Sequence, residues 1–471
     1  MFASAFEALK YIADHEIDMV DLKVAGVGGQ WLHITIPAGG FNEAHFRDGV
    51  GYDGSAGSGF GRVESGDVAA RPEPDTAFID PFCQHPTIGF ICETVTADTK
   101  EPIAYDPRTI ARKAVQRMRD SGIADQAWMA PEYEFHIFDR VELTDSPYET
   151  SVRIHCSEID SREAPAIPVR EGYLRVPPSD RLQDLRSEIA LTLGRLNIPV
   201  RYHHHEVGAP GQCEIEVDLN PLLLAADQAM IIKYVIKNIA RRHGKVATFM
   251  PKPIHGEAGN GMHVHQRLTK DGEPLFYDQS GESYAGLSPL ARQYIGGLLM
   301  HGRALTGLTN PSTNSFKRLV GGYEAPVNLF YSLANRSAAI RVPRYTVAPD
   351  DKRIEYRPPD ATANVYMLLA AMLMAGLDGI ESKVDPAEHD FGPFDVDIAR
   401  QDSEFRRRIV ALPRSLHDAL DALEEDFEFL TRDGVFPESF IRAWIAAKRK
   451  SDHREVASRP HPHEYYLYLD A

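Results

Sequence analysis

Cysteine is scarce in this chain, and long apolar runs are missing. Four cysteines are scattered over 471 residues without a Cys-x-x-Cys pair, which argues against a zinc ribbon and a disulfide framework. The most apolar stretch, residues 365–375, is too short to span a bilayer and predicts a core helix. No basic segment followed by an apolar one opens the chain, so we expect no signal peptide. These absences predict a cytoplasmic protein that does not enter a membrane.

A surplus of basic residues is also missing. The chain has 51 Lys and Arg against 68 Asp and Glu, a net charge of −17, which disfavours nucleic acid as a partner because phosphate backbones are bound by basic surfaces. Several of the basic residues nevertheless concentrate between residues 317 and 357. An acidic protein with such a cluster suits a small anionic substrate, such as a nucleotide with its metal.

The order of sequence patterns indicates two domains. Short runs at residues 33–36 and 88–92, between turns that contain glycine and proline, predict strands in a small β-rich unit. Asp106 followed by Pro107 predicts the start of a helix, because Asp caps a helix and Pro suits its first turn. We therefore expect one domain at residues 1–103 and a second at 104–471.

The second domain alternates predicted strands with predicted helices. Residues 227–243 and 418–430 have helical apolar periodicity, and residues 362–377 are apolar nearly all round. Acidic residues concentrate in the predicted strands. The expected fold class is α+β, with helices packed behind strands that carry acidic side chains.

Two carboxylates, Glu132 and Glu134, stand two residues apart in an apolar, aromatic run. If the run is a β-strand, alternation sends both side chains to one face. Two carboxylates in one buried place repel each other and lose hydration, and a cation relieves both costs. A solvated edge strand is the alternative for an isolated pair, so the other motifs must decide.

A second pair of carboxylates, Glu206 and Glu214, is separated by a turn that contains glycine and proline. Such a turn could bring both carboxylates together from opposed strands. The three histidines at residues 203–205 precede this pair, and a surface tract is the simplest interpretation for them.

Two later motifs repeat the same-face spacing. His263 and His265 would share one strand face, where imidazoles can bind a metal or contact a phosphate. Glu355 and Arg357 would likewise point a carboxylate and a guanidinium into one cleft.

Taken together, the candidate ligands are five glutamates and one histidine, so nearly all donor atoms are oxygen. This set suits hard divalent ions such as Mg²⁺ or Mn²⁺. Ions of this kind often bridge nucleotide phosphates during phosphoryl transfer. Arginines complete such a site by binding oxyanions, and the candidates are Arg318, Arg336, Arg341 and Arg357.

As a set, these motifs resemble the bacterial type I class of glutamine synthetases over essentially the whole chain. The matching segments include PEYEF at 131–135, HHHEVGAPGQCE at 203–214, NGMHVH at 260–265, a dense run at 310–343 and RIEYRPPD at 353–360. The resemblance implies a small N-terminal β-grasp domain and a large catalytic domain whose antiparallel strands form a funnel-shaped active site. It also implies an ATP-dependent ligase that joins glutamate and ammonia through γ-glutamyl phosphate.

The resemblance also implies a role for each candidate residue. One metal would take Glu134, Glu206 and Glu214, and a second, on the nucleotide side, would take Glu132, His263 and Glu355. Glutamate would be bound by Glu134, Gly259, Arg318 and Arg357, and ATP by His265, Arg336, Arg341 and Arg353. The ammonium pocket would be made by Asp53, Tyr173 and Glu324. The catalytic residues would be Asp53, Glu324, Arg336 and Arg357.

Two positions depart from the family pattern and leave the nitrogen donor open. Ala56 stands where the family usually has a serine near the ammonium pocket, and Ala258 replaces an asparagine that helps to place the glutamate backbone. Relatives that ligate glutamate to organic amines keep the metal sites and vary these pockets. A γ-glutamyl amine ligase is therefore the first alternative. A non-catalytic structural relative is much less favoured, because the metal ligands, Asp53 and Glu324 are all present.

The resemblance alone implies the assembly and the number of metals. It implies a homo-oligomer of two stacked hexamers, in which a neighbouring subunit delivers Asp53 to the site. It also implies two or three divalent cations, either Mg²⁺ or Mn²⁺. The segment at 389–394 has no tyrosine, so we expect no control by adenylylation of the kind seen in enterobacterial members.

Overall fold

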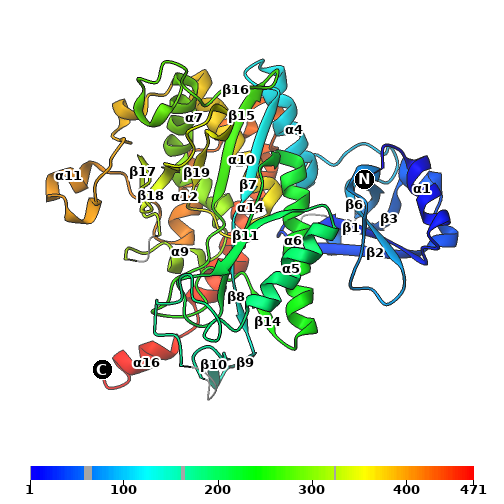
Figure 1. The fold of residues 1–471 in the computed structure, drawn as a ribbon, viewed down its shortest axis with the longest axis horizontal. Helices are drawn as coiled ribbons and strands as arrows, with labels where there is room; N and C mark the ends of the chain where they lie inside the picture. The colour runs from blue at the N-terminus through cyan, green and yellow to red at the C-terminus, as the bar shows by residue number, and fades with distance from the viewer. Residues whose placement is uncertain (1, 58–65, 161–164, 323–324) are drawn as a thin grey trace.

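The computed structural model describes residues 2–57, 66–160, 165–322 and 325–471. Figure 1 shows a small domain, coloured blue, beside a larger domain that contains the rest of the chain. Both contain helices and strands, in agreement with the α+β class predicted from the sequence. The predicted boundary between residues 103 and 104 falls in the segment that joins the last strand of the small domain to helix α4.

The small domain is built on one sheet with the strand order β2-β1-β6-β4-β3, to which β5 adds at β6. Its strands are β1 (Met19–Ala25), β2 (Trp31–Pro37), β3 (Val50–Asp53), β4 (Asp67–Pro72), β5 (Phe78–Ile79) and β6 (Thr87–Thr96). The central pair β1 and β6 is parallel, and its neighbours are antiparallel. Helix α1 (Ala5–Asp14) buries Ala8 and Ile12 in a core that includes Leu22 and Phe90 of these two strands.

The large domain contains two sheets whose strands supply the candidate site. In the described residues, the larger sheet consists of β7 (Gln126–Pro131), β13 (Asn220–Pro221), β15 (Val264–Lys270), β16 (Glu273–Pro274), β17 (Asn328–Leu333), β18 (Ala338–Val342) and β19 (Ile354–Tyr356). The smaller sheet consists of β8 (Tyr133–Phe138), β11 (Val200–His205), β12 (Gln212–Val217) and β14 (Val246–Thr248). Within these two sheets, all described pairs are antiparallel except β17 with β18.

Glu132 marks the point where the chain crosses from one sheet to the other. It lies between β7 and β8 and belongs to neither strand. Its backbone N–H donates to the His263 carbonyl (2.8 Å), while the N–H of Glu134 donates to the Gly261 carbonyl (3.4 Å). The predicted single strand is therefore wrong in detail, because the pairing partner changes here. Both side chains still reach the same cavity.

Helices form the core behind these sheets. The principal ones are α4 (Pro107–Asp120), α5 (Gln183–Arg195), α6 (Leu222–Arg242), α7 (Pro289–Met300), α8 (Gly302–Thr309), α10 (Val365–Glu381) and α14 (Glu438–Lys448). Helix α10 is buried from Val365 to Gly379, as its almost continuous apolar sequence predicts. Among the described residues, none of the helices combines the length and the apolar character that crossing a lipid bilayer would need.

Asp106 caps α4 as predicted, with its carboxylate accepting from the Thr109 N–H (2.9 Å). The predicted helix at residues 418–430 is instead two helices, α12 (Leu416–Glu425) and α13 (Glu428–Thr431). They separate at Asp426, whose backbone is non-helical and whose carboxylate accepts from Nδ1 of His301 (2.8 Å). A long-range contact thus interrupts a locally favourable helix.

Candidate active site

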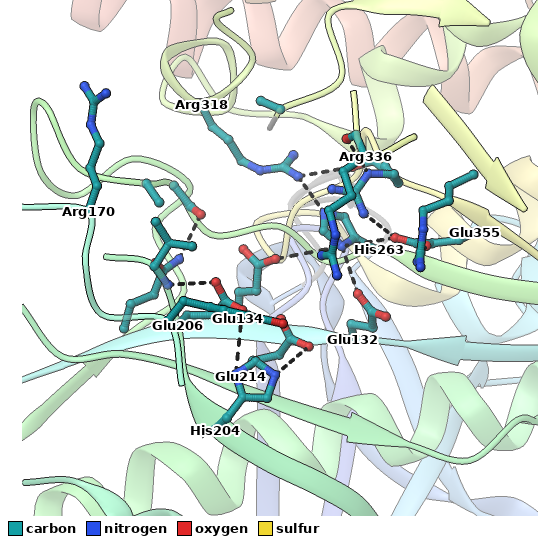
Figure 2. A pocket seen from close by; sticks show the side chains of 18 of the residues that line it. Glu132, Glu134, Arg170, His204, Glu206, Glu214, His263, Arg318, Arg336 and Glu355 are labelled. Carbon is teal, nitrogen blue, oxygen red and sulfur yellow. Dashed lines mark hydrogen bonds and ion pairs between the residues drawn. The ribbon is translucent and has the colours of Figure 1, made fainter. Parts of the chain in front are cut away.

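A cavity of about 580 Å³ is lined by side chains from both sheets of the large domain. Figure 2 shows that its charged side chains form two groups, with Glu134 between them. One group contains His204, Glu206 and Glu214, and the other contains Glu132, His263 and Glu355. Within each group, one donor atom from every member lies within 4.8 Å of the others.

Strand register assembles the first group. His204 of β11 faces Glu214 of β12, and Glu214 faces Glu134 of β8. Directly opposed residues on neighbouring strands place their side chains on the same side of a sheet, so these three side chains form a row. Glu206 follows β11, and its carboxylate lies 3.7 Å from His204 Nδ1, while Nε2 of the same ring is 3.6 Å from Glu214.

The carboxylates of this group are electrostatically unsatisfied. Burial and the neighbouring Glu214 raise the pKa of Glu206 well above its usual range. Burial, Glu132 and Glu134 raise the pKa of Glu214 in the same direction. The physical causes are desolvation and like-charge repulsion, and a divalent cation at this position would remove both.

The second group is tied together by hydrogen bonds. Glu132 lies 2.8 Å from His263 Nδ1 through one carboxylate oxygen and 2.8 Å from His265 Nε2 through the other. Burial alone would raise the pKa of Glu132, but the hydrogen bonds from His263 and His265 outweigh it and hold the pKa well below its usual range. These hydrogen bonds therefore favour the ionised form of Glu132.

Glu355 lies at the other edge of this group, between two guanidiniums. Arg341 and Arg357 each donate to one of its carboxylate oxygens. Burial would raise the pKa of Glu355, and Arg357 is the main cause of its being lowered instead. The predicted common face of Glu355 and Arg357 is confirmed, since both line the cavity.

Two further contacts connect the groups. Glu134 accepts from the Gly261 N–H through Oε2 (2.6 Å), and its Oε1 is 3.8 Å from His263 Nδ1. Arg318 is 4% exposed and donates to Nε2 of His263 (3.1 Å) and to the Pro358 carbonyl (2.8 Å). A side chain at Gly261 would collide with both the arginine and the histidine, because an added Cβ would lie 2.5 Å from Arg318 Nη2.

These donor sets fit hard divalent cations. Each group offers carboxylate oxygens and one imidazole, and cysteine does not contribute to the groups found among the described residues. Oxygen-rich sets with no thiolate match Mg²⁺ or Mn²⁺ better than a structural zinc. The raised pKa values of Glu206 and Glu214 follow from burial and the neighbouring carboxylates, and a bound cation would offset both causes.

The structure brings most of the predicted site residues to one cavity. Those that line it are Glu132, Glu134, Tyr173, Glu206, Glu214, Gly259, His263, Arg318, Arg336, Arg341, Glu355 and Arg357. His265 and Arg353 instead line a second cavity of about 220 Å³. The two cavities share Arg201 as a lining residue.

The two remaining predicted residues are Asp53 and Glu324. Asp53 ends β3 in the small domain and is not among the described residues that line the cavity; its carboxylate accepts from the Ser55 N–H (2.9 Å) and hydroxyl (2.6 Å). Glu324 lies outside the described residues, although its neighbours Gly322 and Ala325 line the cavity.

Some lining residues were missed by sequence reasoning, notably His204, Arg170 and Tyr202. His204 could have been found, because alternation along the strand places it on the same face as Glu206. Arg170 carries no such signal, since it reaches the cavity from a loop in which its N–H donates to Glu257 (3.1 Å).

The loop at residues 258–261 carries the departure noted above. Ala258 and Gly259 line the cavity, whereas Asn260 is fully buried. Asn260 accepts from Gln212 (3.1 Å) and lies 2.9 Å from His136 Nδ1, and it donates to the Met250 carbonyl (2.8 Å). The amide at position 260 therefore anchors the loop, and position 258 presents a methyl group to the cavity.

Comparisons with known proteins agree with this geometry. The β-grasp domain model of glutamine synthetases matches residues 16–97, and the catalytic domain model matches residues 104–468. The glutamine synthetases of Microchaete diplosiphon and Frankia alni are both 44% identical to the chain, over 98% and 100% of it and 99% and 100% of their own lengths.

Solved structures show the same similarity. Plasmodium falciparum glutamine synthetase superposes with a TM-score of 0.89 at 26% identity, over 99% of each chain. A complex of GmaS with ADP gives a TM-score of 0.82 at 28% identity, over 98% of this chain and 99% of the other. The predicted family and the predicted fold, a β-grasp domain followed by a catalytic domain, are thereby confirmed. The chain belongs to the glutamine synthetase family and is a ligase of that family.

Proposed function

We propose that this chain makes glutamine from glutamate and ammonia, using ATP to form γ-glutamyl phosphate. The observation that supports this most strongly is the pairing of two carboxylate–histidine groups in one arginine-lined cavity (Figure 2). A carboxylate does not react with ammonia until its oxygen becomes a leaving group. Phosphoryl transfer supplies that leaving group and requires concentrated positive charge.

The two groups would bind two different ions. Glu206 and Glu214, with Glu134, would hold the ion on the glutamate side, and His204 lies within reach of the same position. Glu132, His263 and Glu355 would hold the ion on the nucleotide side. The bound ions would neutralise charge on the transferring phosphoryl group. The donor sets suit Mg²⁺ and Mn²⁺ equally.

The chain's own cations would bind the substrate anions. Arg318 would bind the α-carboxylate of glutamate beside Gly259, and Arg357 would bind the γ-carboxylate and the phosphoryl group. Arg336 and Arg341 would contact ATP phosphates in the main cavity, and His265 and Arg353 would extend this contact into the second cavity. A planar guanidinium suits these oxyanions because it donates two parallel hydrogen bonds.

Ammonium must lose a proton before it can attack. We assign the proton acceptor to Asp53, and the walls of the ammonium pocket to Tyr173 and Glu324. Asp53 belongs to the small domain and is exposed, so the proposal requires a second copy of the chain to deliver it. A homo-oligomer of two stacked hexamers would meet this requirement. We place the enzyme in the cytoplasm, where glutamate and ATP are available.

A γ-glutamyl amine ligase is the second candidate function. The methyl group of Ala258 in the cavity wall and the likeness to GmaS favour it. An organic amine needs more room than ammonium. Loss of a serine hydroxyl at Ala56, near the expected ammonium pocket, would provide that room, whereas Ala258 would alter the placement of the glutamate backbone. The chemistry of activation would be unchanged.

One assay separates the two functions. Phosphate release is followed with glutamate and ATP while ammonium is replaced in turn by short organic amines and polyamines. Glutamine formation with ammonium at the highest kcat/KM supports the proposal. Negligible turnover with ammonium beside fast turnover with one amine would overturn it in favour of the second candidate. The Ala258→Asn variant tests the role of position 258, because an asparagine at this position, as in the family pattern, should lower the KM for glutamate.

A further inference from the structure

A buried acid–histidine pair lies directly behind Glu206. His205 is 0% exposed and Glu158 is 2% exposed. Nε2 of His205 lies 3.0 Å from Glu158 Oε2, and Nδ1 lies 2.7 Å from the carbonyl oxygen of Glu206. Both ring nitrogens thus lie within hydrogen-bonding distance of an oxygen atom. The ring is fixed between a carboxylate and the backbone of the candidate metal ligand.

The same backbone carries the segment that contains Tyr173. The Gly172 N–H donates to the Val207 carbonyl (3.0 Å), and the Leu174 N–H donates to the His205 carbonyl (3.0 Å). The two hydrogen bonds flank Tyr173, whose ring meets the His204 ring edge-on with centroids 5.5 Å apart. The approach is close enough to require glycine, because a Cβ at Gly172 would lie 2.3 Å from the Glu206 carbonyl oxygen.

Glu158 is itself held on its far side. Its Oε1 accepts from the Arg181 N–H (3.0 Å), and its backbone carbonyl accepts from the Ile167 N–H (2.9 Å). A carboxylate fixed by its own backbone contacts can orient the imidazole that it pairs with. The order of contacts is therefore Glu158, His205, and then the backbone of Glu206 and the segment of Tyr173.

We propose that His205, oriented by Glu158, is a positioning residue that sets the placement of Glu206 relative to Tyr173. This inference rests on the proposed function, in which Glu206 binds the glutamate-side ion and Tyr173 borders the ammonium pocket. One imidazole would then couple the ion to the nitrogen donor, because its ring contacts the Glu206 carbonyl and lies close to Gly172, the neighbour of Tyr173. Hydrogen-bond partners behind metal ligands change metal affinity or activity by about 10–100-fold when removed.

Three variants of the full-length chain test the coupling. His205→Phe removes both hydrogen bonds, His205→Asn keeps a donor that can reach the Glu206 carbonyl, and Glu158→Gln keeps an acceptor for the ring. His301→Phe is the matched control, since His301 is also buried and pairs with two carboxylates but lies outside the cavity. Mn²⁺ binding is titrated by electron paramagnetic resonance, and KM is measured for ATP and for the nitrogen donor.

We expect His205→Phe to weaken one class of Mn²⁺ site about 10–100-fold and to raise the KM of the nitrogen donor, with the KM of ATP changed less than about twofold. His205→Asn should recover most of the Mn²⁺ affinity, and Glu158→Gln should fall between the two. Should His205→Phe fail to fold, the Mn²⁺ affinities of His205→Asn and Glu158→Gln, compared with that of the wild type, test the positioning role instead.

Two outcomes overturn the inference. The first is that the His205 variants lose thermal stability as His301→Phe does but keep wild-type Mn²⁺ affinity and KM values. The second is that the KM of ATP rises as much as that of the nitrogen donor. Glu206→Gln separates this result from failure of the proposed function. If it binds Mn²⁺ like the wild type, the metal assignment itself is wrong; if it loses a site while His205→Phe does not, only the positioning role is wrong.

Discussion

Replacing Glu206 by glutamine removes one negative charge from a group of buried carboxylates that repel one another. The donor atoms of Glu206 and Glu214 lie within 4.8 Å of each other, and two unit charges at that separation repel by about 3 kcal/mol at an effective dielectric constant near 20. Proton uptake already relieves part of this repulsion, which is why the pKa values of both groups are raised. We therefore expect Glu206→Gln to raise the free energy of unfolding without metal by ~1–2 kcal/mol.

The assay is urea unfolding of both proteins, with EDTA and with millimolar Mg²⁺. The wild type should gain about 2.7 kcal/mol when the free ion is at 100 times its dissociation constant, and Glu206→Gln should gain much less. The order of stability should therefore reverse between the two conditions. Glu149→Gln, an exposed glutamate on the β10 (Glu149–His155) strand, is the control and should change neither value.

The pH dependence gives a second check with a defined sign. A carboxyl group whose pKa is raised by folding does not lower the free energy of unfolding at a pH where the same group is also protonated in the unfolded chain. Its cost appears as the pH rises above about 4.3, the usual value for glutamate. Without metal, the advantage of Glu206→Gln should therefore grow from pH 4 toward neutrality. A variant that is less stable than the wild type in EDTA, or gains as much from Mg²⁺, would refute the reasoning.

Two further predictions concern other charged groups. Glu132→Ala should weaken binding of the metal–nucleotide about tenfold or more, and Glu134→Ala should weaken glutamate binding similarly. Calorimetric titration measures both affinities. Equal effects of each change on both ligands would count against assigning Glu132 to the nucleotide side and Glu134 to the glutamate side. Burial would lower the pKa of His301, but Asp378 and Asp426 outweigh it and raise the pKa to about 9. Protonated His301 therefore stabilises the folded protein fully below about pH 6.5, and this contribution is lost as the pH rises past 9. His301→Gln should therefore cost ~2–3 kcal/mol at pH 6 and much less at pH 10 in urea titrations.

Local sequence predicted which residues gather at the cavity better than it predicted the elements that carry them. The Glu132 and Glu134 motif predicted two side chains at one place, and both line the cavity, although the chain changes sheets at Glu132. The break in the helix at Asp426 could not be foreseen, since it depends on a histidine 125 residues away. Local propensity has no access to such a partner.

The histidine run shows the same limit. In the sequence, His203, His204 and His205 are equivalent, and a surface tract was the simplest interpretation. In the structure, His204 lines the cavity, and His205 is buried against Glu158. Alternation predicts that neighbours point to opposite faces, but it does not say which face meets the cavity.

The sequence by itself determined the kind of chemistry: oxygen donors for hard ions, arginines for phosphates, and the family whose motifs occur in order along the chain. Tertiary structure alone brought the donors side by side. His204, Glu214 and Glu134 became neighbours through the register of three strands, two of which are separated by about seventy residues of chain. Register is set by packing over the whole domain, and no local pattern contains it. Asp53 meets the same limit: it does not line the described cavity of its own chain, and the proposed function requires a second copy of the chain to deliver it.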